Sequence, residues 1–565
     1  MKKKTMLFLL GIIIFLFNSC ALTDKKEEVI IQQAVVVEKP VEVIRYVEKS
    51  VPLGDQKYEI SGSNALTVNA GTVSISGKAS AFSGNTVTET LGTESYSEIN
   101  ENGFTDAKTS PLSTFSIDVD TASYSNVRRM LMTQRVLPPK DSVRIEEMIN
   151  YFSYDYKKPG KENGKFGFDF EMGDSPWNKK NKILRIGIQG ENLKEDKKPK
   201  NNLVFLIDVS GSMSSGNKLP LLKESFKKLV NNLDSKDKVS IVVYAGSAGV
   251  VLEPTSGEEK EKIIKALDSL NAGGSTAGGQ GIKKAYDLAS ENLVKNGNNR
   301  VILATDGDFN VGVTTGAELE KLITSYKEKN IYLTILGFGM GNYKDSTMER
   351  LSNKGNGNYF YIDNLKESDK VLSQGLTGTL YTIAKDVKIQ IEFNPAVVKE
   401  YRLIGYENRK LNNEDFKDDK KDAGDVGAGH QVTVLYELIM KNGNSETDVD
   451  KLVYQDSKVK NSSDIATFKL RYKESDGNKS KELKEVLKQD IYKKNNTNDF
   501  NFAVSVAEFG MLLRDSEYKE NLTYEDVLKL AENNKGNDKY EYKAEFIQMV
   551  EKASEIEKET KKAEK

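Results

Sequence analysis

Five oxygen-bearing side chains in the middle of the chain have the types and spacing of a metal site. They are Asp208, Ser210, Ser212, Thr276 and Asp306. The first three follow residues 203–207, an unbroken apolar run typical of a strand buried on both faces. The fourth lies in the glycine-rich segment 272–279, and the fifth follows a second apolar run, residues 301–304. Because ligands bind at the carboxyl ends of the strands in a doubly wound sheet, we expect these side chains to meet there.

The donors of this predicted site are all hard oxygen atoms. No His or Cys is among them, which favours Mg2+ over softer transition metals, with Mn2+ and Ca2+ as alternatives. Two carboxylates only neutralise a divalent cation, and three hydroxyls add no formal charge. A metal held in this way therefore keeps its attraction for one more anion.

The order of these residues resembles the metal-ion-dependent adhesion site of the von Willebrand factor type A domain. That site combines Asp-x-Ser-x-Ser, here at 208–212, with a later Thr and a later Thr-Asp-Gly, here at 305–307. The resemblance implies that Ser210, Ser212 and Thr276 contact the metal. It implies that Asp208 and Asp306 bind the metal directly or through water, and that the added anion is a Glu or Asp of a bound protein.

The sequence around the site resembles that of the YfbK-type bacterial von Willebrand A lipoproteins, from about residue 114 to the last helices. The predicted fold is α/β. A doubly wound, Rossmann-like von Willebrand factor type A domain is inserted in a β-sandwich, with a flexible N-terminal tether and a C-terminal helical region. Strand-like segments stand on both sides of the domain, and neither side alone has enough strands for a stable sheet.

Composition and pattern divide the chain into six segments. They are a lipoprotein signal peptide (1–20), a tether (21–110), a family region with helices and the first sandwich strands (111–197), the metal-binding domain (198–375), further sandwich strands (376–480) and a helical region (481–565). The tether is rich in Val, Glu, Lys, Ser, Thr and Gly, and we expect it to be largely flexible because it buries too little apolar surface. A strand at 35–46 is the alternative for part of it.

The first twenty residues have the charge order of a secretory signal. Lysines at 2–4 precede an apolar run, residues 6–17, which is short for a spanning helix. Cys20 follows as the only cysteine of the chain and resembles the lipidated residue of a bacterial lipobox. Phe17 and Asn18 depart from the usual lipobox pattern, which leaves an ordinary free cysteine as the alternative. We expect a lipid-anchored protein of the cell envelope, in the outer membrane if the cell has one and otherwise on the outer face of the cytoplasmic membrane.

Two further features imitate functional sites. A second motif with the spacing of a metal site consists of Asp118, Asp120 and Ser123. Roles at the end of a strand and in capping a helix explain these residues better. Asp308, two residues beyond Asp306, is equally compatible with an outer contact to the site and with an exposed loop carboxylate.

The sequence supports catalysis less well than binding. Ser210 or Ser212 would need a base as a nucleophile, and the only histidine, His430, lies far along the chain. Metal-assisted hydrolysis would need a base or a Lys/Arg clamp that the motif does not supply. The glycine segments 273–283 and 337–341 lack the spacing of nucleotide sites. We therefore expect that the chain is not an enzyme.

The overall charge does not indicate a class of binding partner. The chain has 82 basic and 84 acidic residues and a net charge of −2, so it has no bias toward nucleic acid. The prediction is a lipid-anchored protein that binds or adheres to another protein through a metal, with the partner supplying a Glu or Asp. One alternative is an assembly or scaffold factor within the envelope. A Mg2+-dependent hydrolase is a second and weaker alternative.

Overall fold

The computed structural model describes the chain in two units, Met1–Asn85 and Thr86–Lys565. The described residues are 28–34, 46–52, 56–60, 64–69, 72–77, 94–117, 120–275, 278–307, 316–441, 462–475, 477 and 479–563. The signal segment, Cys20 and the larger part of the stretch 35–46 lie outside them.

The first unit contains short strands within the predicted tether. β1 (Glu28–Ala34) pairs with β2 (Tyr46–Pro52), and a separate antiparallel sheet joins β3 (Gln56–Ile60), β4 (Asn64–Asn69) and β5 (Thr72–Gly77). Val, Ile, Thr and Tyr recur in these strands and have high β propensity. That local preference accounts for the short strands within the predicted tether.

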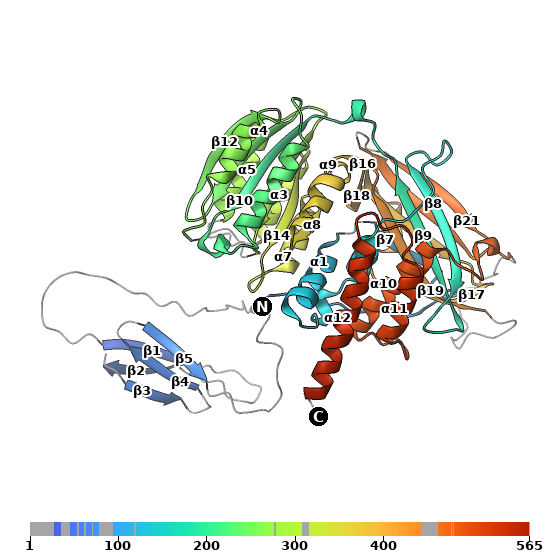
Figure 1. The fold of residues 1–565 in the computed structure, drawn as a ribbon, viewed down its shortest axis with the longest axis horizontal. Coiled ribbons are helices and arrows are strands. Elements are labelled where there is room, and N and C mark those ends of the chain that lie inside the picture. Colours follow the sequence, from blue (N-terminus) through green and yellow to red (C-terminus); the bar gives the residue numbers. More distant parts are fainter. Residues whose placement is uncertain are drawn as a thin grey trace, which may run out of the picture. The chain divides into compact units, whose positions relative to one another are not determined.

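A six-stranded sheet forms the centre of the predicted metal-binding domain (Figure 1). Its strands are β10 (Asn201–Asp208), β11 (Lys238–Tyr244), β12 (Ala248–Ser256), β13 (Asn298–Thr305), β14 (Ile331–Phe338) and β15 (Tyr359–Ile362). The order across the sheet is β12-β11-β10-β13-β14-β15, with β12 antiparallel and the others parallel. The strand order therefore reverses between β10 and β13, as a doubly wound sheet requires.

Helices cover both faces of this sheet. They are α3 (Leu219–Asn231), α4 (Lys260–Asp268), α5 (Gly278–Glu291), α6 (Gly316–Lys327) and α7 (Asp345–Lys354). Successive side chains of β10 point to opposite faces. Leu203, Phe205 and Ile207 share one core with α3 and α4, while Val204 and Leu206 share another with α5, α6 and α7. The unbroken apolar run in β10 is thus explained by burial on both sides.

Strands from before and after this domain pair with one another, which confirms the predicted insertion. β9 (Asn181–Gly190) pairs with β19 (Gln431–Met440), and the sheet order is β6-β17-β19-β9-β8. The second sheet runs β18-β16-β20-β21, with β7 (Leu112–Ser116) beside β16 (Thr382–Phe393). The other strands of the first sheet are β6 (Thr105–Asp106), β8 (Phe166–Asp174) and β17 (Val398–Ile404). The other strands of the second sheet are β18 (Gly424–Gly427), β20 (Ala466–Glu474) and β21 (Ser480–Leu487).

The two sheets form one sandwich. Phe168 of β8 meets Phe468 of β20 edge to face, with ring centroids 5.1 Å apart, and residues of both sheets belong to one apolar core.

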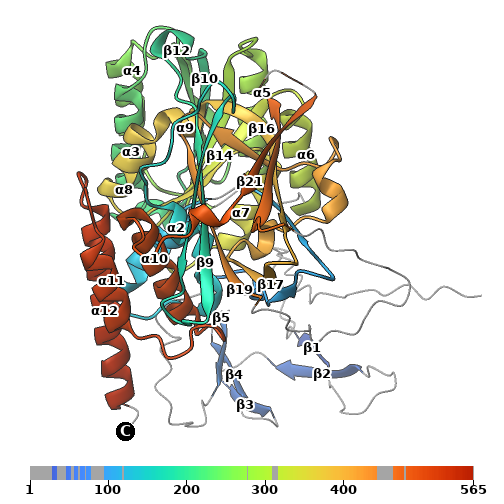
Figure 2. The same cartoon turned by 90° about the vertical axis from the view of Figure 1, so that its right-hand side faces the viewer.

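A helical part lies against the first sheet of the sandwich (Figure 2). It joins α10 (Asn498–Arg514), α11 (Tyr524–Asn533) and α12 (Tyr542–Ala563) with α1 (Ala122–Arg128) and α2 (Ile145–Asn150) in one core. The expected helical region from 481 starts later than predicted, because β21 pairs with β20 as far as Leu487. β21 is rich in Lys and Glu, so its sequence lacks the alternation of apolar and polar residues that would indicate a strand. Among the described residues no helix is both long and apolar enough to span a membrane.

The insertion predicts how fragments will behave. Residues 198–375 should fold alone, because the six strands and their covering helices lie within this range. Residues 376–480 should not fold alone, because β9 and β7 precede the inserted domain and are the partners of β19 and β16. Circular dichroism and NMR dispersion of the two purified fragments would measure this. A cooperatively unfolding 376–480 fragment would contradict the insertion.

Candidate functional site

The two predicted carboxylates lie at the carboxyl ends of neighbouring strands. Asp208 is the last residue of β10 and Asp306 follows β13 directly, and the strands are in register at Ile207 and Ala304. Both side chains are buried, with 0% of their surface exposed. They meet where the strand order reverses, as the sequence predicted.

Hydrogen bonds fix the Asp208 carboxylate in place. Its Oδ1 accepts the backbone N–H of Ser210 at 2.9 Å, and its Oδ2 accepts the hydroxyls of Tyr244 and Thr305, each at 3.2 Å. Burial raises the pKa of Asp208 above its ordinary value, and the negative charge of Asp306 adds to that increase. The charged form of Asp208 is therefore disfavoured unless a neighbouring cation compensates it.

The two serines of the motif lie side by side above these carboxylates. The hydroxyl oxygens of Ser210 and Ser212 are 3.0 Å apart, with Ser210 buried and Ser212 exposed to solvent. The glycine-rich segment contacts the same turn, because Gly211 N–H donates to the Gly274 carbonyl at 3.0 Å and Gly273 N–H donates to Val209 at 2.7 Å. Ser212 therefore leaves this side of the turn open to solvent.

Two predicted residues lie outside the described part of the chain. They are Thr276 and Asp308. Their roles stay predictions, although the contact of Gly273 and Gly274 with the serine turn brings the described end of the Thr276 segment to the site.

Lys218 also belongs to this site and was not predicted from the sequence. Its ammonium donates to Asp306 Oδ2 at 2.8 Å, and only 9% of its side chain is exposed. Lys218 is the residue before α3, a position where Ser, Thr, Asp or Asn is usual. That departure from helix-capping preference was the available signal.

The residues present fit a divalent cation. Lys218 pairs with Asp306, so one of the two carboxylates has an ammonium partner. The hydroxyls of Ser210 and Ser212 add neutral oxygen donors, which suit Mg2+. No group of three or more His, Cys, Asp or Glu with the geometry of a metal site exists among the described residues, because the remaining donors here are hydroxyls.

The sequence features that imitate other sites have structural roles. Asp120 accepts the backbone N–H of Tyr359 at 2.8 Å and pairs with Arg409, and Ser123 donates to the carbonyl of Ser142 at 2.6 Å. His430 lies on the sandwich just before β19, and burial lowers its pKa to about 4. Asp118 is outside the described residues.

A short N-terminal segment is attached to the edge of the site. Glu94 Oε1 accepts the backbone N–H of Gly341 at 2.8 Å, and Ser95 N–H donates to the Tyr343 carbonyl at 3.1 Å. Gly341 and Tyr343 belong to residues 339–344, the loop between β14 and α7, which packs against Gly307 beside Asp306. The folded body therefore begins by Glu94, earlier than the predicted boundary at 110, because these hydrogen bonds hold the segment in place.

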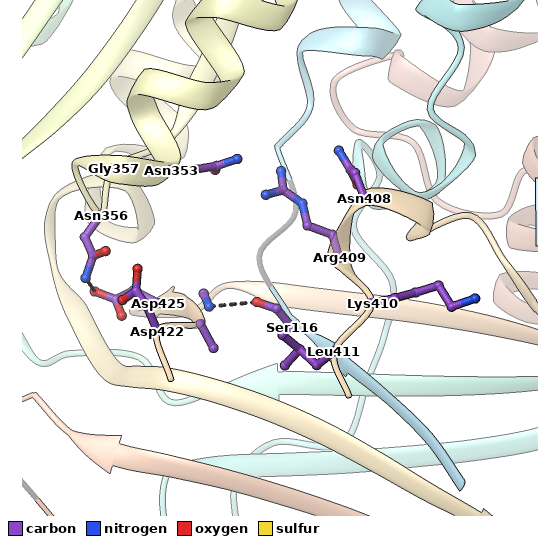
Figure 3. A pocket seen from close by; sticks show the side chains of 12 residues that line it. Ser116, Asn353, Asn356, Gly357, Asn408, Arg409, Lys410, Leu411, Asp422 and Asp425 are labelled. Carbon is purple, nitrogen blue, oxygen red and sulfur yellow. Dashed lines mark hydrogen bonds between the residues drawn. The ribbon is translucent and has the colours of Figure 1, made fainter. Parts of the chain in front are cut away.

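A polar hollow of about 180 Å³ lies elsewhere, between the inserted domain and the sandwich (Figure 3). It begins beside Asn356, before β15, and so lies at the amino ends of the strands, away from Asp208. Its polar groups largely bind each other: Asn356 donates to Asp425 at 3.4 Å and Gly424 N–H to Ser116 at 2.7 Å. Burial raises the pKa of Asp425 to about 7. This hollow lies where two parts of the fold meet. Its polar groups are less available to a ligand than those of the strand-end site.

Three family models match the chain. The model described as "von Willebrand factor type A domain" matches residues 202–374, "von Willebrand factor" matches 90–185, and "Uncharacterized protein YfbK, C-terminal" matches 378–556. The first of these covers the six-stranded sheet and the site.

Individual relatives match to different extents. The YfbK protein of Escherichia coli (strain K12) is 42% identical over 475 residues, which covers 82% of each chain. Human inter-alpha-trypsin inhibitor heavy chain H4 is 32% identical over 147 residues, or 24% of this chain and 16% of that one. The solved structure of von Willebrand factor type A from Catenulispora acidiphila is 16% identical, with a TM-score of 0.38, over 68% of this chain and 89% of that one.

The N-terminal attachment predicts a stability effect. Glu94 forms a bidentate ion pair with Arg129 at 2.8 and 2.9 Å, and the two side chains are 1% and 4% exposed. Glu94→Gln leaves the Arg129 charge buried without its partner, which should lower the free energy of unfolding by about 3 kcal/mol. Urea unfolding would measure this. Glu98→Gln is the control, because Glu98 is exposed and should change stability by less than about 0.5 kcal/mol. Equal losses in both variants would contradict the role of Glu94.

Proposed function

Because this chain belongs to the YfbK family of von Willebrand factor type A proteins, we propose that it binds another protein through a divalent cation at the strand-end site. The von Willebrand factor type A fold places the chain among protein-interaction modules. The cation is Mg2+, with Mn2+ or Ca2+ as substitutes, held by Asp208, Ser210, Ser212, Thr276 and Asp306.

One observation carries the proposal. Asp208 and Asp306 are fully buried at the ends of adjacent strands, and burial raises the pKa of Asp208. Burying two carboxylates together is unfavourable unless a cation compensates them. An arrangement with this cost is typical of functional sites.

The ligands explain how a partner would be recognised. When bound, the cation supplies an open coordination position with affinity for an anionic oxygen. Asp208 is held rigidly by Ser210, Tyr244 and Thr305, so it keeps its geometry without the partner. The Ser212 hydroxyl lies at the surface, where a Glu or Asp of the partner protein can approach.

The N-terminal sequence supports a membrane location for the proposed activity. We propose that Cys20 carries a lipid and anchors the protein in the cell envelope, in the outer membrane if the cell has one and otherwise on the outer face of the cytoplasmic membrane. The lysines at 2–4, the apolar run 6–17 and the single cysteine support this.

A pull-down tests the metal-dependent docking. Residues 86–565 would be incubated with envelope extract in Mg2+ or in EDTA. A partner should be retained only by wild type in Mg2+, whereas Asp208→Ala should lose it because one carboxylate ligand is gone. Glu258→Ala is the control, since Glu258 is an exposed acidic residue of the same domain. Identical partners with Mg2+, EDTA and Asp208→Ala would overturn the metal-dependent docking.

Lipidation is tested at Cys20. Cys20→Ser should abolish metabolic labelling with a fatty-acid analogue and release the protein from the membrane fraction, because the thiol is the attachment atom. Ser19→Ala keeps the cysteine and a small neighbour, so it should still be labelled. Labelling that survives in Cys20→Ser would contradict the proposed anchor.

A further inference from the structure

Lys218 occupies a place in the site that ordinary helix chemistry does not favour. It directly precedes α3, and Leu222 N–H donates to its carbonyl at 2.8 Å, so it stands at the helix N-terminus. Its side chain forms no cap there. A positive charge is unfavourable at this end of a helix because of the helix dipole. The ion pair with Asp306 compensates for this placement.

The structure makes room for this lysine with a glycine. Gly339 has a φ of +76°, which favours glycine, and a Cβ at this position would lie 2.6 Å from Lys218 Cγ. The Tyr361 hydroxyl donates to the Gly339 carbonyl and fixes the loop at that point. Gly339 therefore leaves room for the Lys218 side chain, whose ammonium reaches Asp306.

From this arrangement we infer that Lys218 is an internal cation that competes with the metal for Asp306. In the metal-free protein its ammonium neutralises one of the two buried carboxylates. Metal binding displaces the ammonium, because the two cations repel each other and share one carboxylate. The inference rests on the proposed function, since it presupposes that a divalent cation binds at this site.

This role makes Lys218 a determinant of metal affinity rather than a ligand. Loss of the Lys218 ammonium makes the charge that the metal meets more negative by one unit. Removing the ammonium should therefore strengthen metal binding and at the same time weaken the metal-free fold, where the buried Asp306 would lose the Lys218 ion pair. A purely structural lysine would not produce these opposite signs.

The first test uses the full-length chain in detergent and MnCl2 as the probe. Free Mn2+ is measured by electron paramagnetic resonance, and thermal unfolding is measured in EDTA. Lys218→Met removes the charge but keeps an apolar chain of similar length. It should bind Mn2+ about tenfold or more tightly than wild type and unfold at a lower temperature in EDTA. Lys223→Met is the control, since the Lys223 ammonium donates to the Asp268 carbonyl at 3.0 Å and has no part in the site.

The second test needs no substitution at the site. An amine-reactive reagent should modify Lys218 slowly in EDTA, where 9% of the side chain is exposed, and faster in saturating Mn2+. Mass spectrometry of the digested protein reports both Lys218 and Lys223, and the Lys223 rate should not change.

The outcomes separate the two proposals. If Mn2+ binds wild type and Lys218→Met equally, and Lys218 stays protected, the competition is overturned while the metal site stands. If Mn2+ binds neither protein, the proposed metal-dependent function fails and the competition fails with it. Tighter binding by Lys218→Met with faster labelling in Mn2+ supports both.

Discussion

The burial of two carboxylates at the ends of adjacent strands is the constraint on which the site depends. Asp208 and Asp306 are withdrawn from water, and each must be compensated by neighbours. The hydroxyls of Tyr244 and Thr305 donate hydrogen bonds to Asp208, and the Lys218 ammonium pairs with Asp306. These partners come from β11, from β13 and from the start of α3, so the compensation involves several elements of the domain.

The inserted domain is also held to its surroundings by buried charge. Arg144, just before α2, pairs with Asp345 of α7 at 2.6 Å, and Arg128 of α1 pairs with Glu367 at 2.8 Å. Buried ion pairs are costly to break because they leave an unpaired charge, and they define geometry more than they add stability. The helices before the insertion therefore fix how the domain lies against the rest of the second unit.

The loop 339–344 connects these two systems. Its Gly339 borders Lys218, its Gly341 is bound by Glu94, and its end leads into α7 at Asp345. A shift of this loop would change the space around Lys218 and the attachment of the N-terminal segment together. The site is thus continuous with the segment that begins the folded body.

The sequence by itself determined the local chemistry and the class of fold. Apolar runs such as 203–207 indicate a strand that is buried on both faces. Asp208 and Asp306 each follow such a run, which was sufficient to predict that both lie at one edge of a parallel sheet. Those signals are local, because a strand and the turn that follows it are read from a few consecutive residues. The insertion was also predictable, since strand patterns stood on both sides of the domain.

Only the tertiary structure decided which distant residues complete the site. Lys218 meets Asp306 across 88 positions of sequence, and Glu94 meets Gly341 across 247. Neither pair has a sequence period or motif, because ion pairs and loop hydrogen bonds depend on how separate elements pack. The same reason explains β21, whose Lys- and Glu-rich pattern becomes a strand through pairing with β20.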